Sequence, residues 1–81
     1  MITKVHFYSY FKELTGCTET SVELAEGATI EQLYAELIRR YPKLAAMNHS
    51  TLIAVGAEYQ GRSYVLKPGD EVSLFPPVQG G

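Results

Sequence analysis

Apolar and polar positions alternate at both ends of the chain, which is the pattern of strands with one buried face. Residues 1–8 alternate in this way and are rich in strand-forming residues, so they predict a first strand. Residues 71–75 predict the last strand, entered through a type II turn at residues 67–70, where proline and glycine hold the two central positions. The inward positions are Val5, Phe7, Val72 and Leu74, and the outward ones are Lys4, His6, Tyr8 and Phe75.

Shorter patterns fill the space between these two strands. Residues 11–14 predict one or two helical turns, and residues 18–24 predict a second strand. Residues 51–55 are apolar on both faces, which favours a third strand with a central place in the sheet. We expect residues 44–50 to be an irregular connection and residues 64–65 to form a short edge strand.

The clearest pattern predicts one long helix. Thr29 precedes Gln32 by three residues, which is the capping-box spacing at a helix start, and Pro42 ends the pattern. Apolar residues recur between these limits at helical spacing, namely Ile30, Leu33, Tyr34, Leu37, Ile38 and Tyr41. This single stripe indicates a helix packed against a sheet.

The order of these elements predicts the fold. Two strands, a helix and two or three further strands are the order of the β-grasp, an α+β fold. We expect a mixed sheet of about four to five strands, crossed by the one main helix, with the first and last strands parallel and side by side in the centre. Residues 1–75 are the predicted domain, and residues 76–81 a flexible, extended C-terminal tail that ends in Gly-Gly.

Size and charge restrict the function. A chain of 81 residues allows one domain and leaves no room for a deep, walled active site, so chemistry is expected at an end or on a surface, completed by a partner. The net charge of −2 and the scattered basic residues give no reason to expect nucleic acid. Because no apolar run approaches a membrane span and no leader pattern opens the chain, we expect a cytoplasmic protein with no membrane association.

Conventional catalytic groups are sparse. His6 and His49 lie far apart in the sequence, and no cysteine, aspartate or serine motif is placed to work with either. Cys17 is the one cysteine, and it has no cationic neighbour that would favour the thiolate. We therefore interpret these residues as a solvent-facing strand histidine, a loop histidine and a passive thiol, and we expect no metal site and no bound cofactor.

The C-terminal tail is the exception. Pro76 and Pro77 form a stiff base, and six residues from there reach roughly 20 Å when extended. Gly80 and Gly81 lack Cβ atoms, so they pass a narrow channel and leave the terminal carboxylate unhindered. Once activated, for example as an acyl-adenylate, such a carboxylate accepts sulfur and becomes a thiocarboxylate. The alternative interpretation is an idle chain terminus.

Two segments carry a family resemblance. The ending GDEVSLFPPVQGG (residues 69–81) and the start VHFYSYFKELTG (residues 5–16) resemble the MoaD-like sulfur carriers, the small-subunit family of molybdopterin synthase. The resemblance implies that an adenylating enzyme of the ubiquitin-activating type uses ATP to activate Gly81, and that a sulfur donor converts it to a thiocarboxylate. It further implies that the tail enters the large, catalytic subunit, where the sulfur builds the dithiolene of molybdopterin. The small subunit itself is not catalytic.

The same resemblance implies a docking surface. An apolar patch beside the tail contacts both partners in related proteins, and by position it maps onto Tyr8, Tyr59 and Phe75 here. This chain departs from the family pattern with Gly56 after the third strand, where asparagine is usual, and with Tyr59, where an aliphatic residue is usual. Partner choice is therefore open at this stage.

Other functions stay open from the sequence. The protein is alternatively a sulfur carrier for thiazole or thionucleoside synthesis, although the diproline before the glycines favours the synthase family. It is alternatively a ubiquitin-like modifier joined through Gly81 to lysines, or a β-grasp interaction module with an idle tail.

Overall fold

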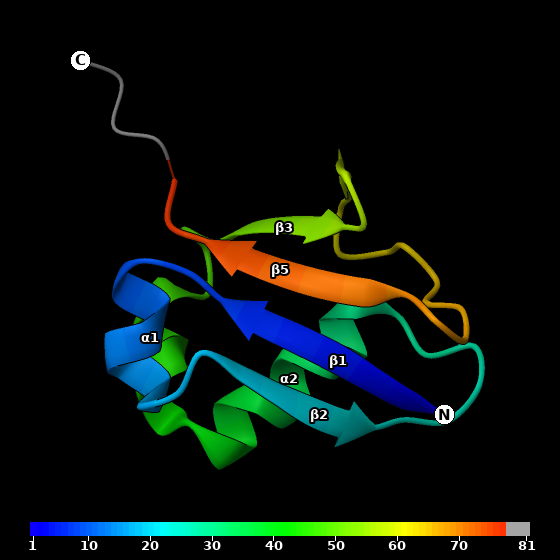
Figure 1. Ribbon diagram of the computed structural model, residues 1–81, viewed down its shortest axis with the longest axis horizontal. Coiled ribbons are helices and arrows are strands. Elements are labelled where there is room, and N and C mark those ends of the chain that lie inside the picture. Colours follow the sequence, from blue (N-terminus) through cyan, green and yellow to red (C-terminus); the bar gives the residue numbers. More distant parts are fainter. Residues whose placement is uncertain (78–81) are drawn as a thin grey trace.

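The computed structural model describes residues 1–77, in which one mixed sheet is crossed on one face by a helix (Figure 1). The elements in chain order are β1 (Ile2–Phe7), α1 (Tyr10–Thr15), β2 (Glu19–Glu23), α2 (Ile30–Arg40), η1 (Pro42–Met47), β3 (Leu52–Val55), β4 (Glu58–Tyr59) and β5 (Glu71–Phe75). The strand order is β2-β1-β5-β3-β4. Strands β1 and β5 are parallel neighbours and the other pairs are antiparallel, so the predicted α+β β-grasp sheet is confirmed.

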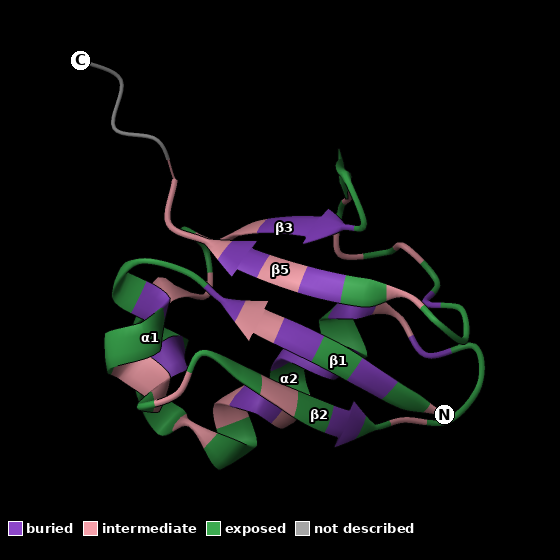
Figure 2. Ribbon diagram, viewed as in Figure 1, coloured by how far each residue is buried: buried purple, intermediate pink, exposed green. Residues whose placement is uncertain are grey.

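The core lies between the sheet and α2 (Figure 2). The alternation predicted for β1 and β5 is confirmed, because the four inward side chains are at most 1% exposed. The apolar stripe of α2 meets them with four buried residues, Ile30, Leu33, Tyr34 and Leu37. Both central strands thus turn one face to the helix and leave the other face open.

Helix α2 begins at the predicted capping box. The Thr29 N–H donates to Gln32 Oε1 over 2.9 Å, and the Gln32 N–H donates to Thr29 Oγ1 over 3.3 Å. These two bonds satisfy backbone and side-chain groups that a bare helix end would leave without partners. The shorter predicted helix is also present as α1, and it ends at Gly16, which has the left-handed φ of 76°.

The prediction of an irregular connection at residues 44–50 is wrong for most of its length. Pro42 ends α2, but it also starts the 3₁₀ helix η1, because its fixed φ suits a first helical position. Within η1, Leu44 is completely buried. This short helix therefore closes one end of the core.

The edge strand predicted at residues 64–65 is also wrong, because no strand lies there and the edges of the sheet are β2 and β4. The segment that contains Tyr64 instead lies against the start of α2. The Ile30 N–H donates to the Tyr64 carbonyl and the Glu31 N–H donates to the Arg62 carbonyl, each over 3.0 Å. Its carbonyl groups therefore accept hydrogen bonds from N–H groups in the first turn of α2, which have no partner within the helix, and not from a neighbouring strand.

The third strand has a neighbour on each side, so its predicted place inside the sheet is confirmed. It lies between β5, which holds the middle position, and the two residues of β4 at the edge. The turn before β5 has the predicted form, since Gly69 has a φ of 91° and the Asp70 N–H donates to the Lys67 carbonyl over 3.0 Å. Among residues 1–77, no helix has the length and apolar character that a membrane crossing requires.

Candidate functional site

Three aromatic side chains meet on the open face of the sheet, where β1 and β5 end. Phe75 stacks on Tyr8 with ring centroids 4.8 Å apart and planes 8° from parallel. Tyr59 meets Phe75 edge-on, at 6.5 Å and 76°. We call Tyr8, Tyr59 and Phe75 the aromatic trio. Tyr59 is 67% exposed and Tyr8 42% exposed, so this is an apolar surface that water still reaches.

Strand register brings the trio together. Phe7 pairs with Leu74 in the parallel ladder, so the next residues of both strands, Tyr8 and Phe75, point to the open face together. In the antiparallel ladder between β3 and β4, the small residue Ala54 pairs with Tyr59, which carries the large ring. The predicted outward orientation of Tyr8 and Phe75 is confirmed, whereas the docking role of the trio stays a prediction.

The backbone turns sharply directly after Tyr8. Ser9 has a φ of 51°, which residues other than glycine rarely adopt. The Tyr8 N–H still donates to the Leu74 carbonyl over 3.3 Å, which extends the parallel pairing by one residue before α1 begins. Tyr8 is therefore fixed on both sides, by the ladder before it and by the turn after it.

The predicted tail starts at the trio. Pro76 and Pro77 follow Phe75 and are both half-buried. Proline has no N–H to donate, so the ladders of β5 end here and the chain leaves the sheet. The other predicted tail residues, Gly80 and Gly81, lie outside the described residues.

His6 has partners that the sequence did not indicate. Its Nε2 lies 2.8 Å from Glu71 Oε1 and its Nδ1 lies 3.5 Å from Glu19 Oε2, so it bridges three neighbouring strands. The hydrogen bond from His6 is the main cause that lowers the pKa of Glu71, and the nearby charges of His6 and Lys4 act in the same direction. The predicted solvent-facing strand histidine thus pairs with a glutamate on each of the two neighbouring strands. Only the strand register reveals this pairing, and the register is not visible in the sequence.

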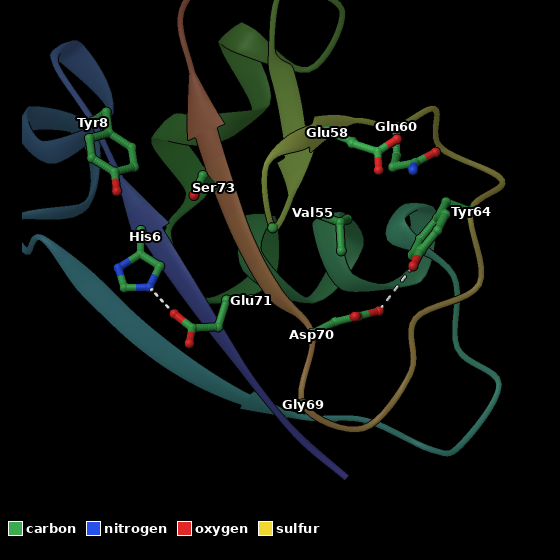
Figure 3. Close-up of a pocket in the computed structure, with 11 residues that line it drawn as sticks. His6, Tyr8, Val55, Glu58, Gln60, Tyr64, Gly69, Asp70, Glu71 and Ser73 are labelled. Carbon is green, nitrogen blue, oxygen red and sulfur yellow. Dashed lines mark hydrogen bonds and ion pairs between the residues drawn. The ribbon is translucent and has the colours of Figure 1, made fainter.

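A hollow of about 590 Å³ opens beside His6 on this side of the molecule (Figure 3). We call it the acidic hollow, and the lining residues that give it its chemical character are His6, Tyr8, Glu58, Tyr64, Asp70 and Glu71. Figure 3 shows Asp70 joined to Tyr64, and Glu71 joined to His6 across the start of β5. Tyr8 belongs to both the hollow and the aromatic trio, so the two features form one continuous surface.

The remaining candidate groups lie elsewhere. Cys17 is half-buried, and its Sγ lies 3.8 Å from the Tyr41 hydroxyl and 3.6 Å from Thr15 Oγ1. His49 is exposed, beside a smaller polar hollow that Arg62 also lines. Within residues 1–77, no three side chains of the usual metal-ligating types are grouped to hold a metal.

A five-strand mixed sheet crossed by one helix, with parallel first and last strands, defines a β-grasp domain. A crystal structure of SAMP1 from Haloferax volcanii has this fold with a TM-score of 0.89 over 100% of both chains, at 21% identity. The model of the ThiS family matches residues 5–81, and the chain belongs to this family.

Relatives in the family extend over the whole chain. The molybdopterin synthase sulfur carrier subunit of Chlamydomonas reinhardtii is 36% identical over 100% of both chains. The protein of the same name from Escherichia coli is 35% identical, over 96% of this chain and 98% of its own. Among solved structures, a putative molybdopterin converting factor subunit 1 from Pyrococcus furiosus is 32% identical, with a TM-score of 0.88 over 96% of this chain and 99% of its own.

Proposed function

We propose that this protein is the sulfur-carrier subunit of a molybdopterin synthase and that it carries sulfur on the carboxylate of Gly81. The whole-length similarity to proteins named molybdopterin synthase sulfur carrier subunit is the observation that carries the proposal. The site agrees with it, because β5 leads directly into Pro76 and Pro77 beside an exposed aromatic surface.

The chemistry proposed for Gly81 takes place in two steps. A carboxylate oxygen attacks the α-phosphate of ATP in an adenylating enzyme, and pyrophosphate leaves. A hydrosulfide released by the sulfur donor then attacks the carbonyl carbon, AMP leaves with that oxygen, and the thiocarboxylate remains on Gly81. The activating enzyme, the donor and the ATP are expectations from the family resemblance, and this chain supplies the reacting carboxylate rather than the catalysis.

The proposed receiving partner is the large, catalytic subunit of the synthase. A structure of molybdopterin-converting factor subunits 1 and 2 from Helicobacter pylori is a protein–protein complex, and its matching chain has a TM-score of 0.70 over 100% of both chains, at 24% identity. We expect the tail of this chain to enter the large subunit while the folded domain stays outside. Both glycines suit that role, because a channel for a chain without Cβ atoms can be narrow.

The experiment is a top-down mass spectrum after incubation with ATP, an adenylating enzyme and a sulfur donor. We expect the C-terminal fragments to carry one oxygen replaced by sulfur. Oxidation of Met1 or Met47 adds nearly the same mass, so the fragment assignment is essential. A variant lacking Gly81 is the control, and it should lose sulfur transfer completely while it folds normally, because the core is built from residues between Val5 and Leu74.

Two outcomes would contradict the proposal. A bare carboxylate on Gly81 after this incubation would exclude a sulfur carrier. A tail found joined to lysine side chains of other proteins, with no thiocarboxylate, would favour a ubiquitin-like modifier instead.

A further inference from the structure

We propose that the acidic hollow receives a guanidinium group, an arginine side chain of the partner protein that takes up the tail. The identity of that partner rests on the proposed function. The aromatic trio would then be only half of the docking surface, and the hollow would be its polar half.

The charges of the chain are unevenly distributed around the sheet. Five of the nine acidic side chains lie on the open face or line the hollow, namely Glu19, Glu23, Glu58, Asp70 and Glu71. Of the seven Lys and Arg residues, only Lys4 on the open face and Lys67 near the rim of the hollow lie on this side. The side of the sheet that carries the trio is thus negative, although the whole chain has a net charge of only −2. Charge of one sign on a docking surface favours a partner of the opposite sign.

The carboxylates of the hollow have acceptor capacity that the chain itself does not use. Glu71 accepts from His6 through Oε1, and Asp70 accepts from the Lys67 N–H and the Tyr64 hydroxyl through Oδ2. Neither the second oxygen of these two groups nor either oxygen of Glu58 has a hydrogen-bond partner among residues 1–77. A guanidinium group presents five N–H donors in a fixed plane, so it fits several carboxylate oxygens at once.

Other occupants fit the hollow less well. Sites for small molecules are mostly enclosed and lined by apolar side chains. This hollow is open to water and lined mainly by polar groups. The acidic residues are also not grouped as metal ligands within the described part of the chain. A long cationic side chain from an adjoining protein surface fits better, because it needs neither an enclosed apolar pocket nor carboxylates grouped as metal ligands.

The hollow lies within reach of a protein that holds the tail. Glu71 and Phe75 are the two ends of β5, so the hollow and the start of the tail are about 13 Å apart at the usual rise of a strand. A partner that covers the aromatic trio therefore also reaches Glu58 and Glu71 without any change in this domain. Tyr8, which lines the hollow and stacks on Phe75, is the shared boundary.

The test is the binding of the large subunit to Glu58 variants, measured by titration calorimetry at low and high salt. Glu58 is exposed on a two-residue edge strand, so its substitution should leave the fold unchanged. Glu36→Gln is the matched control, because it removes the same charge from α2 on the other side of the sheet. We expect Glu58→Gln to weaken binding about tenfold and Glu58→Lys about a hundredfold, with a smaller salt dependence, while the control stays within about twofold.

The outcomes separate this proposal from the proposed function. If the unaltered chain binds the large subunit and Glu58→Lys behaves like the control, the guanidinium proposal is wrong and the proposed function stands. If the unaltered chain does not bind the large subunit, both fail. If the chain alone forms a dimer that Glu58→Lys dissociates, the occupant is a second copy of this protein and the proposal is overturned.

Discussion

The two faces of the sheet differ sharply in exposure, although the same strands supply both. On the covered face, Phe7 and Leu74 are 1% exposed and pack under α2. On the open face, one residue further along the same two strands, Tyr8 is 42% exposed and Phe75 half-buried. Because side chains alternate along a strand, the residues that stabilise the fold and those available for recognition are separate sets. Substitutions on the open face can therefore alter the exposed surface without loss of the core.

The largest effect on stability should come from the covered face. We expect Phe7→Ala to lower the free energy of unfolding by about 3–5 kcal/mol, because it removes a fully buried ring from a closed core. Urea denaturation followed by circular dichroism measures this change. A decrease below about 1 kcal/mol would mean that the covered face does not supply the stability of the fold.

The open face should give the opposite result. Phe75→Ala is expected to weaken binding of the large subunit about tenfold or more, as for a central aromatic anchor. Its effect on stability should be about 1 kcal/mol, since the half-buried ring of Phe75 packs against Tyr8 and Tyr59 and is not part of the core cluster. Ile2→Ala is the matched control, because Ile2 is 68% exposed and lies at the other end of β1. A decrease in stability of several kcal/mol for Phe75→Ala would make it a core residue.

The smallest effect concerns the His6–Glu71 pair. Glu71 has a lowered pKa in the folded chain, so the unfolded chain binds the proton more readily. The stabilisation from this pair is therefore present above the ordinary glutamate pKa, about 4.3, and is lost as the pH falls through the lower folded value. We expect His6→Val, which removes the donor, to raise the pKa of Glu71 towards its ordinary value. NMR titration of the Glu71 carboxyl carbon measures this, and an unchanged pKa would exclude His6 as its main cause.

Elements with strong periodicity could be predicted from the sequence. The stripe of α2 and its capping box give both the extent of that helix and its packed face. The alternation in β1 and β5 gives the orientation of Tyr8 and Phe75, and the element order gives their parallel pairing. These features depend on local spacing, which a sequence records directly.

The errors at residues 64–65 and in the edge strand have a common physical cause, which is that long-range hydrogen bonds decided the structure there. Val65 has the composition of a strand residue, but it makes only an isolated bridge with Thr29 at the start of α2. The two residues of β4 are too few to show any period, and only pairing with β3 defines them. The His6 pairs and the acidic hollow likewise depend on strand register, so neither could be predicted from the sequence.

The position of β5 also has a mechanical consequence. A force applied to the tail along the axis of β5 would reach the sheet through Pro76. This strand is bonded to β1 on one side and to β3 on the other, through hydrogen bonds that run across the direction of pull. The load is shared by both ladders at once instead of opening them one bond at a time. Both ladders would therefore have to open together before a force at the end of β5 could separate this strand from the sheet.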